Sequence, residues 1–106
     1  MVKLLIGSAI LAALWQNAAT DGARNQLRSC IKQAAAEAKG QKLGADALPA
    51  FIHQKCATQE ASFKSAMWAF DSKNKVSRKQ SQEDAELQIE DIVTVAAEHY
   101  AMQPQQ

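Results

Sequence analysis

The chain has 106 residues, with 12 lysines and arginines against 11 aspartates and glutamates, and apolar residues make up 47% of it. This length predicts a single domain. The nearly balanced charge gives no overall field that would recruit nucleic acid or an acidic membrane surface. The sequence also lacks the hydrolase motifs, the phosphate-binding glycine loop and the Cys-x-x-Cys pair of common enzyme classes. We therefore expect a protein that is not an enzyme.

The segment 1–19 has the pattern of an export signal. Lys3 gives it a positive start, residues 4–14 form an uncharged apolar run, and a polar exit ends in small residues at Ala19. A cut after Ala19 would leave Asn17 at a position where a small residue is preferred. We predict that residues 1–19 are a signal peptide and that this cleavage position is the weak point of the pattern.

Two alternatives for this segment stay open. It could remain as an uncleaved membrane anchor with Trp15 at the headgroup level, although residues 4–15 fall short of the roughly 20 apolar residues that a spanning helix needs. It could also be a core helix of a cytosolic protein. With the signal removed, residues 20–106 would form one helical domain that is periplasmic or secreted.

Three segments after the signal repeat apolar residues every three or four positions, which predicts amphipathic helices rather than strands. They cover about 22–39, about 46–72, and a third segment that begins at either Ser77 or Ser81. Both serines have capping spacing, and Ser81 would place acidic residues in the first turn, where the helix dipole favours them. Gly40 is expected to close the first helix in a left-handed cap. The predicted fold is all-α: an antiparallel helical hairpin completed by a third helix into a small three-helix bundle, with the signal helix preceding it.

The two cysteines are symmetrically placed about the predicted turn. Cys30 lies thirteen residues before residue 43, and Cys56 lies thirteen residues after it. Such positions face each other at the same height in an antiparallel hairpin, and both cysteines fall on apolar stripes. We predict a disulfide bridge, which stabilises the fold by roughly 3 to 4 kcal/mol in the chain-entropy model. Export would bring the chain to an oxidising compartment, where such a bridge can form. Two free buried thiols are the alternative.

Metal binding is the first functional alternative. His53 lies three residues before Cys56, and with Cys30 and His99 it would complete a set of two cysteines and two histidines. Structural zinc sites usually have closely paired ligands, which this chain lacks, and no covalent haem attachment motif is present. We expect no metal and no cofactor, with His53 and His99 as weak candidate ligands. A metal- or haem-binding helical protein stays as the alternative.

A basic cluster lies between the second and third predicted helices. It consists of Lys73, Lys75, Arg78 and Lys79. This cluster is the candidate contact for an anionic group, and it supports a second alternative, a cytosolic protein that binds nucleic acid or a membrane surface. Acidic residues follow at once and no aromatic residue is interleaved for base stacking. We expect a solvated turn, and a membrane contact only if the N-terminal segment is retained.

Trp68 lies away from the main apolar stripe of the second segment. The helical period places it beside Ala57, Ala61 and Lys64. A large aromatic residue at such a position either packs on the third helix or serves as a docking anchor. These four residues are therefore the candidate surface for a partner.

The expected function is protein binding or a structural role in the bacterial envelope. The plan is a small exported helical domain stabilised by one disulfide, with an unidentified protein partner, and it is compatible with a homo-oligomer. This plan resembles that of small single-disulfide helical envelope proteins, including the periplasmic acid-stress chaperones. Their cysteines are more widely spaced, and the resemblance carries over no residue.

Overall fold

The computed structural model describes the backbone of residues 2–103 and the side chains of residues 18–103. This part of the chain is helical and contains no strand, which confirms the all-α prediction. It holds four packed α-helices and a short 3₁₀ turn in the order α1 (Val2–Gly40), η1 (Ala45–Ala47), α2 (Leu48–Lys55), α3 (Ala57–Lys73) and α4 (Arg78–Met102). The second predicted segment is thus two helices.

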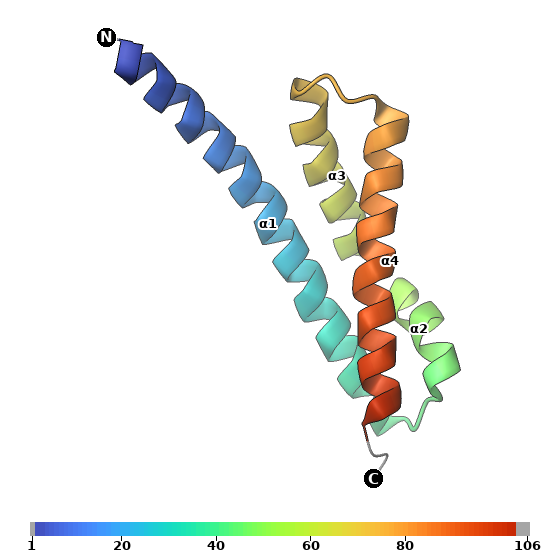
Figure 1. The fold of residues 1–106 in the computed structure, drawn as a ribbon. Helices are drawn as coiled ribbons and strands as arrows, with labels where there is room; N and C mark the ends of the chain where they lie inside the picture. The colour runs from blue at the N-terminus through green and yellow to red at the C-terminus, as the bar shows by residue number, and fades with distance from the viewer. Residues whose placement is uncertain (1, 104–106) are drawn as a thin grey trace.

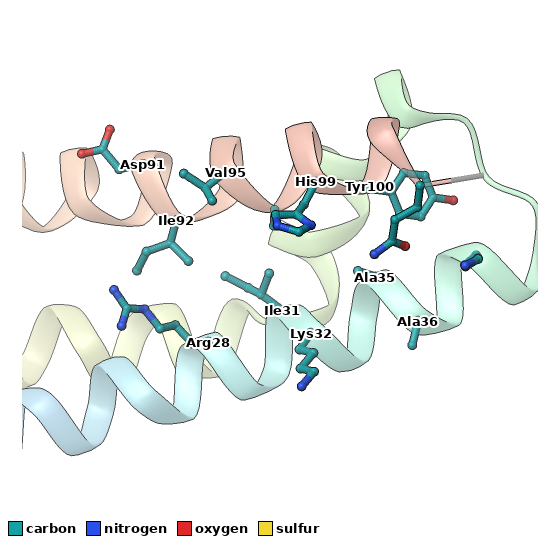
Figure 2. Close-up of a pocket in the computed structure, with 13 residues that line it drawn as sticks. Arg28, Ile31, Lys32, Ala35, Ala36, Asp91, Ile92, Val95, His99 and Tyr100 are labelled. Carbon is teal, nitrogen blue, oxygen red and sulfur yellow. The ribbon is translucent and has the colours of Figure 1, made fainter. Parts of the chain in front are cut away.

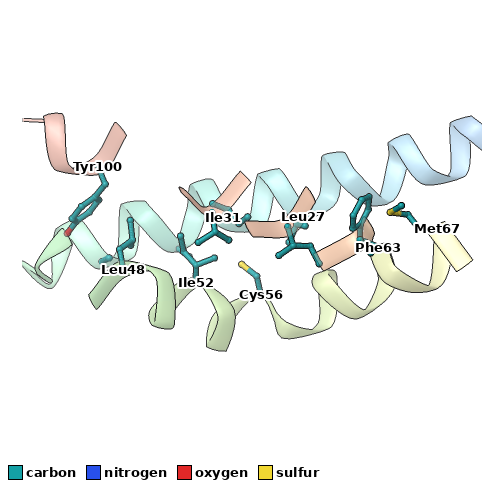
Figure 3. Packing of buried hydrophobic residues seen from close by; sticks show 13 residues of the cluster. Leu27, Ile31, Leu48, Ile52, Cys56, Phe63, Met67 and Tyr100 are labelled. Atoms are coloured by element: carbon teal, nitrogen blue, oxygen red, sulfur yellow. The ribbon is translucent and has the colours of Figure 1, made fainter. Parts of the chain in front are cut away.

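The helices α1 and α4 run in the same direction, and α2 and α3 return antiparallel to both (Figure 1). Helix α3 packs along both α1 and α4, whereas α1 and α4 contact each other less. The buried side chains form one core along these contacts (Figure 3). Its members with the lowest exposure include Leu27, Ala38, Leu48, Ile52, Cys56, Phe63 and Ala85.

The prediction of one continuous helix over 46–72 is wrong at Cys56. This residue has φ −109° and ψ 19°, outside the helical range, and it separates α2 from α3. In a straight helix four residues advance about 40° beyond a full turn, so the buried stripe of α2 would wind away from α1. The change of direction at Cys56 lets both α2 and α3 bury their apolar faces against α1 and α4.

The first helix does not end in the predicted glycine cap. Gly40 is the last helical residue, and Lys42 adopts the left-handed conformation, with φ 58°. The amide of Leu43 donates to the carbonyl of Ala38 at 2.9 Å, and the amide of Lys42 donates to that of Lys39 at 3.0 Å. These two bonds form a Schellman motif, in which the left-handed residue is the second after the last helical one. The motif is therefore present with lysine at the position that usually holds glycine.

Helix α4 begins after Ser77, the earlier of the two predicted starts. The amide of Gln80 donates to the Ser77 hydroxyl at 3.1 Å. The side chain of Gln80 turns instead to Asp84, donating to a carboxylate oxygen at 2.8 Å. Ser81 is buried at 2% exposure inside the helix. The helix therefore has basic residues and no acidic residue in its first turn, which the helix dipole disfavours.

Helix α1 continues without a break through the expected cleavage position after Ala19, and its first part extends beyond the other helices (Figure 1). The side chains of residues 1–17 lie outside those that the structure describes, so the export signal stays a prediction. Among the described residues, no helix combines the length and the apolar character needed to cross a bilayer.

Candidate functional site

An open groove of about 780 Å³ runs between α1 and α4. Its floor is apolar, with Ile31 and Ala35 from α1 and Ile92 and Ala96 from α4. Ile31 and Ile92 point into the space between the two helices, and Tyr100 closes one end (Figure 2). The groove exists because alanines lie on both sides of the seam, where longer side chains would fill the space between the helices.

The two ends of the groove are fixed by hydrogen bonds. At one end Arg24 of α1 donates to the side-chain oxygen of Gln88 of α4 at 2.9 Å, and it also pairs with Asp21 at 2.7 Å. At the other end the Tyr100 hydroxyl donates to the carbonyl of Leu43, in the turn after α1. These two bonds set the spacing of α1 and α4 at the two ends of the groove, and the apolar floor lies open between them.

The two rims of the groove differ in charge. The α1 rim carries Arg28, Lys32 and Lys39, all exposed, at positions that share one face of the helix. The α4 rim carries Asp91 and the apolar Val95, whose side chain is 58% exposed. An apolar floor between charged rims is typical of a site that receives an amphipathic ligand.

Sequence reasoning missed this groove. The predicted amphipathic segments gave no indication of how closely the first and third of them approach each other. The available signal was the row of alanines at positions 34–36 beside the basic residues of α1. Small residues at a helix seam leave space when the neighbouring helix also carries small residues there, and only the fold shows that pairing.

The predicted cysteine pair comes together between α1 and the bend of α2 and α3. The Cα atoms of Cys30 and Cys56 lie 5.9 Å apart, within the range of disulfides, and their sulfur atoms are at bonding distance. Cys56 is fully buried in the row between Ile52 and Phe63 (Figure 3). Cys30 precedes Ile31 of the groove floor. The bridge position thus ties one wall of the groove to the returning helices.

The two histidines are not brought together with the cysteines into a metal site. His53 has both ring nitrogens occupied: Nδ1 lies 2.9 Å from Glu60 and Nε2 lies 3.1 Å from Glu90. His99 lies on the α4 side of the groove instead. The side chains that the structure describes contain no group of three or more potential metal ligands. His53 instead connects α2, α3 and α4 through its two carboxylate neighbours.

The predicted partner surface around Trp68 is partly covered. The guanidinium carbon of Arg78 lies 5.3 Å from the centre of the Trp68 ring, in a cation–π contact. Lys64 reaches towards Glu86 of α4 at 3.8 Å, and Ala57 and Ala61 are exposed. The aromatic residue therefore connects α3 to the start of α4 while keeping part of its surface accessible.

The basic cluster surrounds the turn between α3 and α4, and all four of its side chains are exposed. Lys75 adopts a left-handed conformation with φ 62° in this turn, and Arg78 is engaged by Trp68. Lys73 and Lys79 lie on either side. The cluster is an exposed turn, and one of its four cations already has an aromatic partner.

Comparison of the chain with protein-family models, with curated proteins and with solved structures finds no match.

Proposed function

We propose that the protein is exported and acts by binding a helix of a protein partner in the groove between α1 and α4. The observation that carries this proposal is the open apolar floor of the groove, with Val95 exposed on its edge. Apolar surface gathered in a concave site between charged rims marks an interaction site more often than scattered exposed residues do. Burying one valine side chain contributes about 1.5 kcal/mol to binding.

A helix fits the shape of the groove. The walls are two helices, and the α1 rim from Arg28 to Lys39 extends about 17 Å at the rise of an α-helix, or three turns. Amphipathic helices bind such grooves through apolar residues on one face. The hydrogen bonds of Arg24 and Tyr100 hold the two walls of the groove in place before a partner binds. Less conformational entropy of the walls is then lost when the partner binds.

The cysteine pair supports the exported location. A Cys30–Cys56 bridge persists in oxidising compartments and is rare in the cytosol. It would hold α1, which forms one wall of the groove, against the bend at Cys56. We therefore propose that the exported protein carries both the bridge and the preformed groove.

The intact mass of the protein isolated from its own cells tests the exported location. We expect a chain that lacks residues 1–19 and is lighter by two hydrogen atoms than its reduced form. A full-length chain with two alkylatable thiols would contradict export and the bridge together. The groove does not depend on this result.

A photoreactive amino acid introduced at Ala36 tests the groove. Ala36 is exposed and lines the groove, so a larger side chain is tolerated there. The matched control is the same amino acid at Ala61, which is exposed on α3 beside Trp68. We expect irradiation of producing cells to yield a covalent protein adduct from position 36 only. An adduct from position 61 alone would move the binding site to the Trp68 surface, and no adduct from either position would refute the proposal.

A further inference from the structure

The outward face of α4 carries a regular stripe of acidic and apolar residues. Three large apolar side chains stand out as exposed among the described residues, and all are on this helix: Leu87 at 65%, Val95 at 58% and Met102 at 83%. Acidic residues alternate with them along the same face, and in chain order the acidic–apolar stripe consists of Asp84, Leu87, Asp91, Val95, Glu98 and Met102. Steps of three and four residues keep all six within one side of the helix.

The spacing of the acidic residues matches the basic rim of the groove. Asp84, Asp91 and Glu98 are seven residues apart, about 10.5 Å along the helix. Lys32 and Lys39 on the α1 rim are also seven residues apart. A helix lying along the groove could therefore place two successive carboxylates beside these two lysines. Its apolar residues would then face the floor formed by Ile31 and Ile92.

The charges of the helix segments 80–98 and 22–40, which flank the groove, agree with this match. From residue 80 to residue 98, α4 carries six carboxylates and no lysine or arginine. From residue 22 to residue 40, α1 carries four cations and one carboxylate. Within one chain, the groove separates the basic rim from the acidic–apolar stripe. A side-chain hydrogen bond between α1 and α4 joins Arg24 to the neutral Gln88.

From these observations we propose that the occupant of the groove is helix α4 of a second copy of this chain. The inference rests on the proposed function, because it names the partner of the same groove. The acidic–apolar stripe of each copy lies along the basic rim of the other. Helix α4 is then both a wall of its own groove and the ligand of its neighbour's groove, which is the self-complementary arrangement that a two-fold dimer requires. Two copies each of α1 and α4 form a four-helix layer at the interface.

Two double variants with reversed charge test the dimer. In the first, Lys32→Glu and Lys39→Glu reverse the basic rim; in the second, Asp91→Lys and Glu98→Lys reverse the stripe. All four side chains are exposed, so both variants should fold, and circular dichroism checks this. We expect the protein, in the form that cells accumulate, to sediment as a dimer. Either variant alone should dimerise at least about tenfold more weakly, because like charges then face each other.

An equimolar mixture of the two variants is the decisive sample. In a mixed dimer each reversed surface faces a surface of opposite charge, so the mixture should regain dimerisation close to that of the unmodified protein. Non-specific association through apolar residues would not show this recovery. A monomeric unmodified protein, or a mixture that dimerises no better than its components, would overturn the inference.

The cross-linking experiment at Ala36 separates failure of the dimer from failure of the groove. An adduct with the mass of two chains supports both proposals. An adduct with a different protein keeps the groove as a binding site and overturns the second copy as its occupant. The absence of any adduct overturns both.

Discussion

Lys42 and Lys75 adopt backbone angles that usually favour glycine, with φ 58° and 62° respectively. Each follows the end of a helix, and the amide of the next residue donates back to a carbonyl of that helix: Leu43 to Ala38 after α1, and Val76 to Asp71 after α3. The left-handed conformation costs a residue with a Cβ atom roughly 1 to 2 kcal/mol. Each of the two turns therefore holds a lysine in a left-handed conformation that is unfavourable for a residue with a Cβ atom.

Replacement of Lys42 by glycine should stabilise the fold. We expect Lys42→Gly to raise the free energy of unfolding by about 0.5 to 1 kcal/mol, because relief of the left-handed conformation exceeds the larger entropy of glycine in the unfolded chain. Urea denaturation measures the difference. Lys39→Gly is the matched control, since Lys39 is helical and glycine there should destabilise the protein by a similar amount. If Lys42→Gly and Lys39→Gly changed the free energy of unfolding by the same amount in the same direction, the Schellman motif at Lys42 would be contradicted.

Ser77 and Ser81 show how far local pattern determines a helix start. Both were compatible with the sequence, and the acidic residues after Ser81 favoured the later start. The structure uses Ser77 as the cap and buries Ser81 in the core. A side-chain cap contributes about 1 kcal/mol, comparable with the whole effect of charges on the helix dipole. Burial of Ser81, which depends on neighbouring helices, decided between two nearly equal local choices.

At the scale of the helix, the sequence indicated the apolar stripe of 46–72 but not its bend. Each half, Leu48 with Ile52 and Phe63 with Met67, has the spacing of a straight amphipathic helix. The bend at Cys56 follows no proline or glycine. It arises where the chain must meet α1 at the cysteine pair and then turn to pack between α1 and α4.

Loss of the bridge should destabilise the connection of α1 with α2 and α3. The cysteines are separated by 26 residues, and the chain-entropy model assigns a loop of this size about 3.5 kcal/mol. We expect a reductant to lower the free energy of unfolding by about this amount in urea denaturation. The double variant Cys30→Ala, Cys56→Ala is the control and should not respond to the reductant. If the reductant also left the free energy of unfolding of the unmodified protein unchanged, the bridge would be shown not to form.

At the scale of the whole molecule, the chain is elongated. Its radius of gyration is 17.3 Å and its longest extent is 63 Å, whereas a compact domain of this length has a radius of about 13 Å. The first part of α1 accounts for much of this shape, since it extends beyond the other helices (Figure 1). Among the side chains of α1 that the structure describes, the core begins with the partly buried Ala23 and the fully buried Leu27.

Removal of residues 1–19 should therefore leave the fold intact. We expect a chain that starts at Thr20 to keep its helical circular dichroism signal and the urea midpoint of the longer chain, because all core residues among the described side chains 18–103 are retained. A chain that starts at Ile31 is the contrasting control. It lacks Leu27 and Cys30 and should lose cooperative unfolding. A large drop in stability on removing only residues 1–19 would favour the core-helix alternative over an export signal.

The sequence by itself determined the helical class, the end of the first helix near Gly40 and the pairing height of Cys30 and Cys56. These features depend on the period of apolar residues and on distance along the chain, both of which are local. The tertiary structure alone decided the bend at Cys56 and the groove between α1 and α4. These depend on the volume left between side chains from distant segments, such as Ala35 and Ala96, and no local pattern records how such side chains meet.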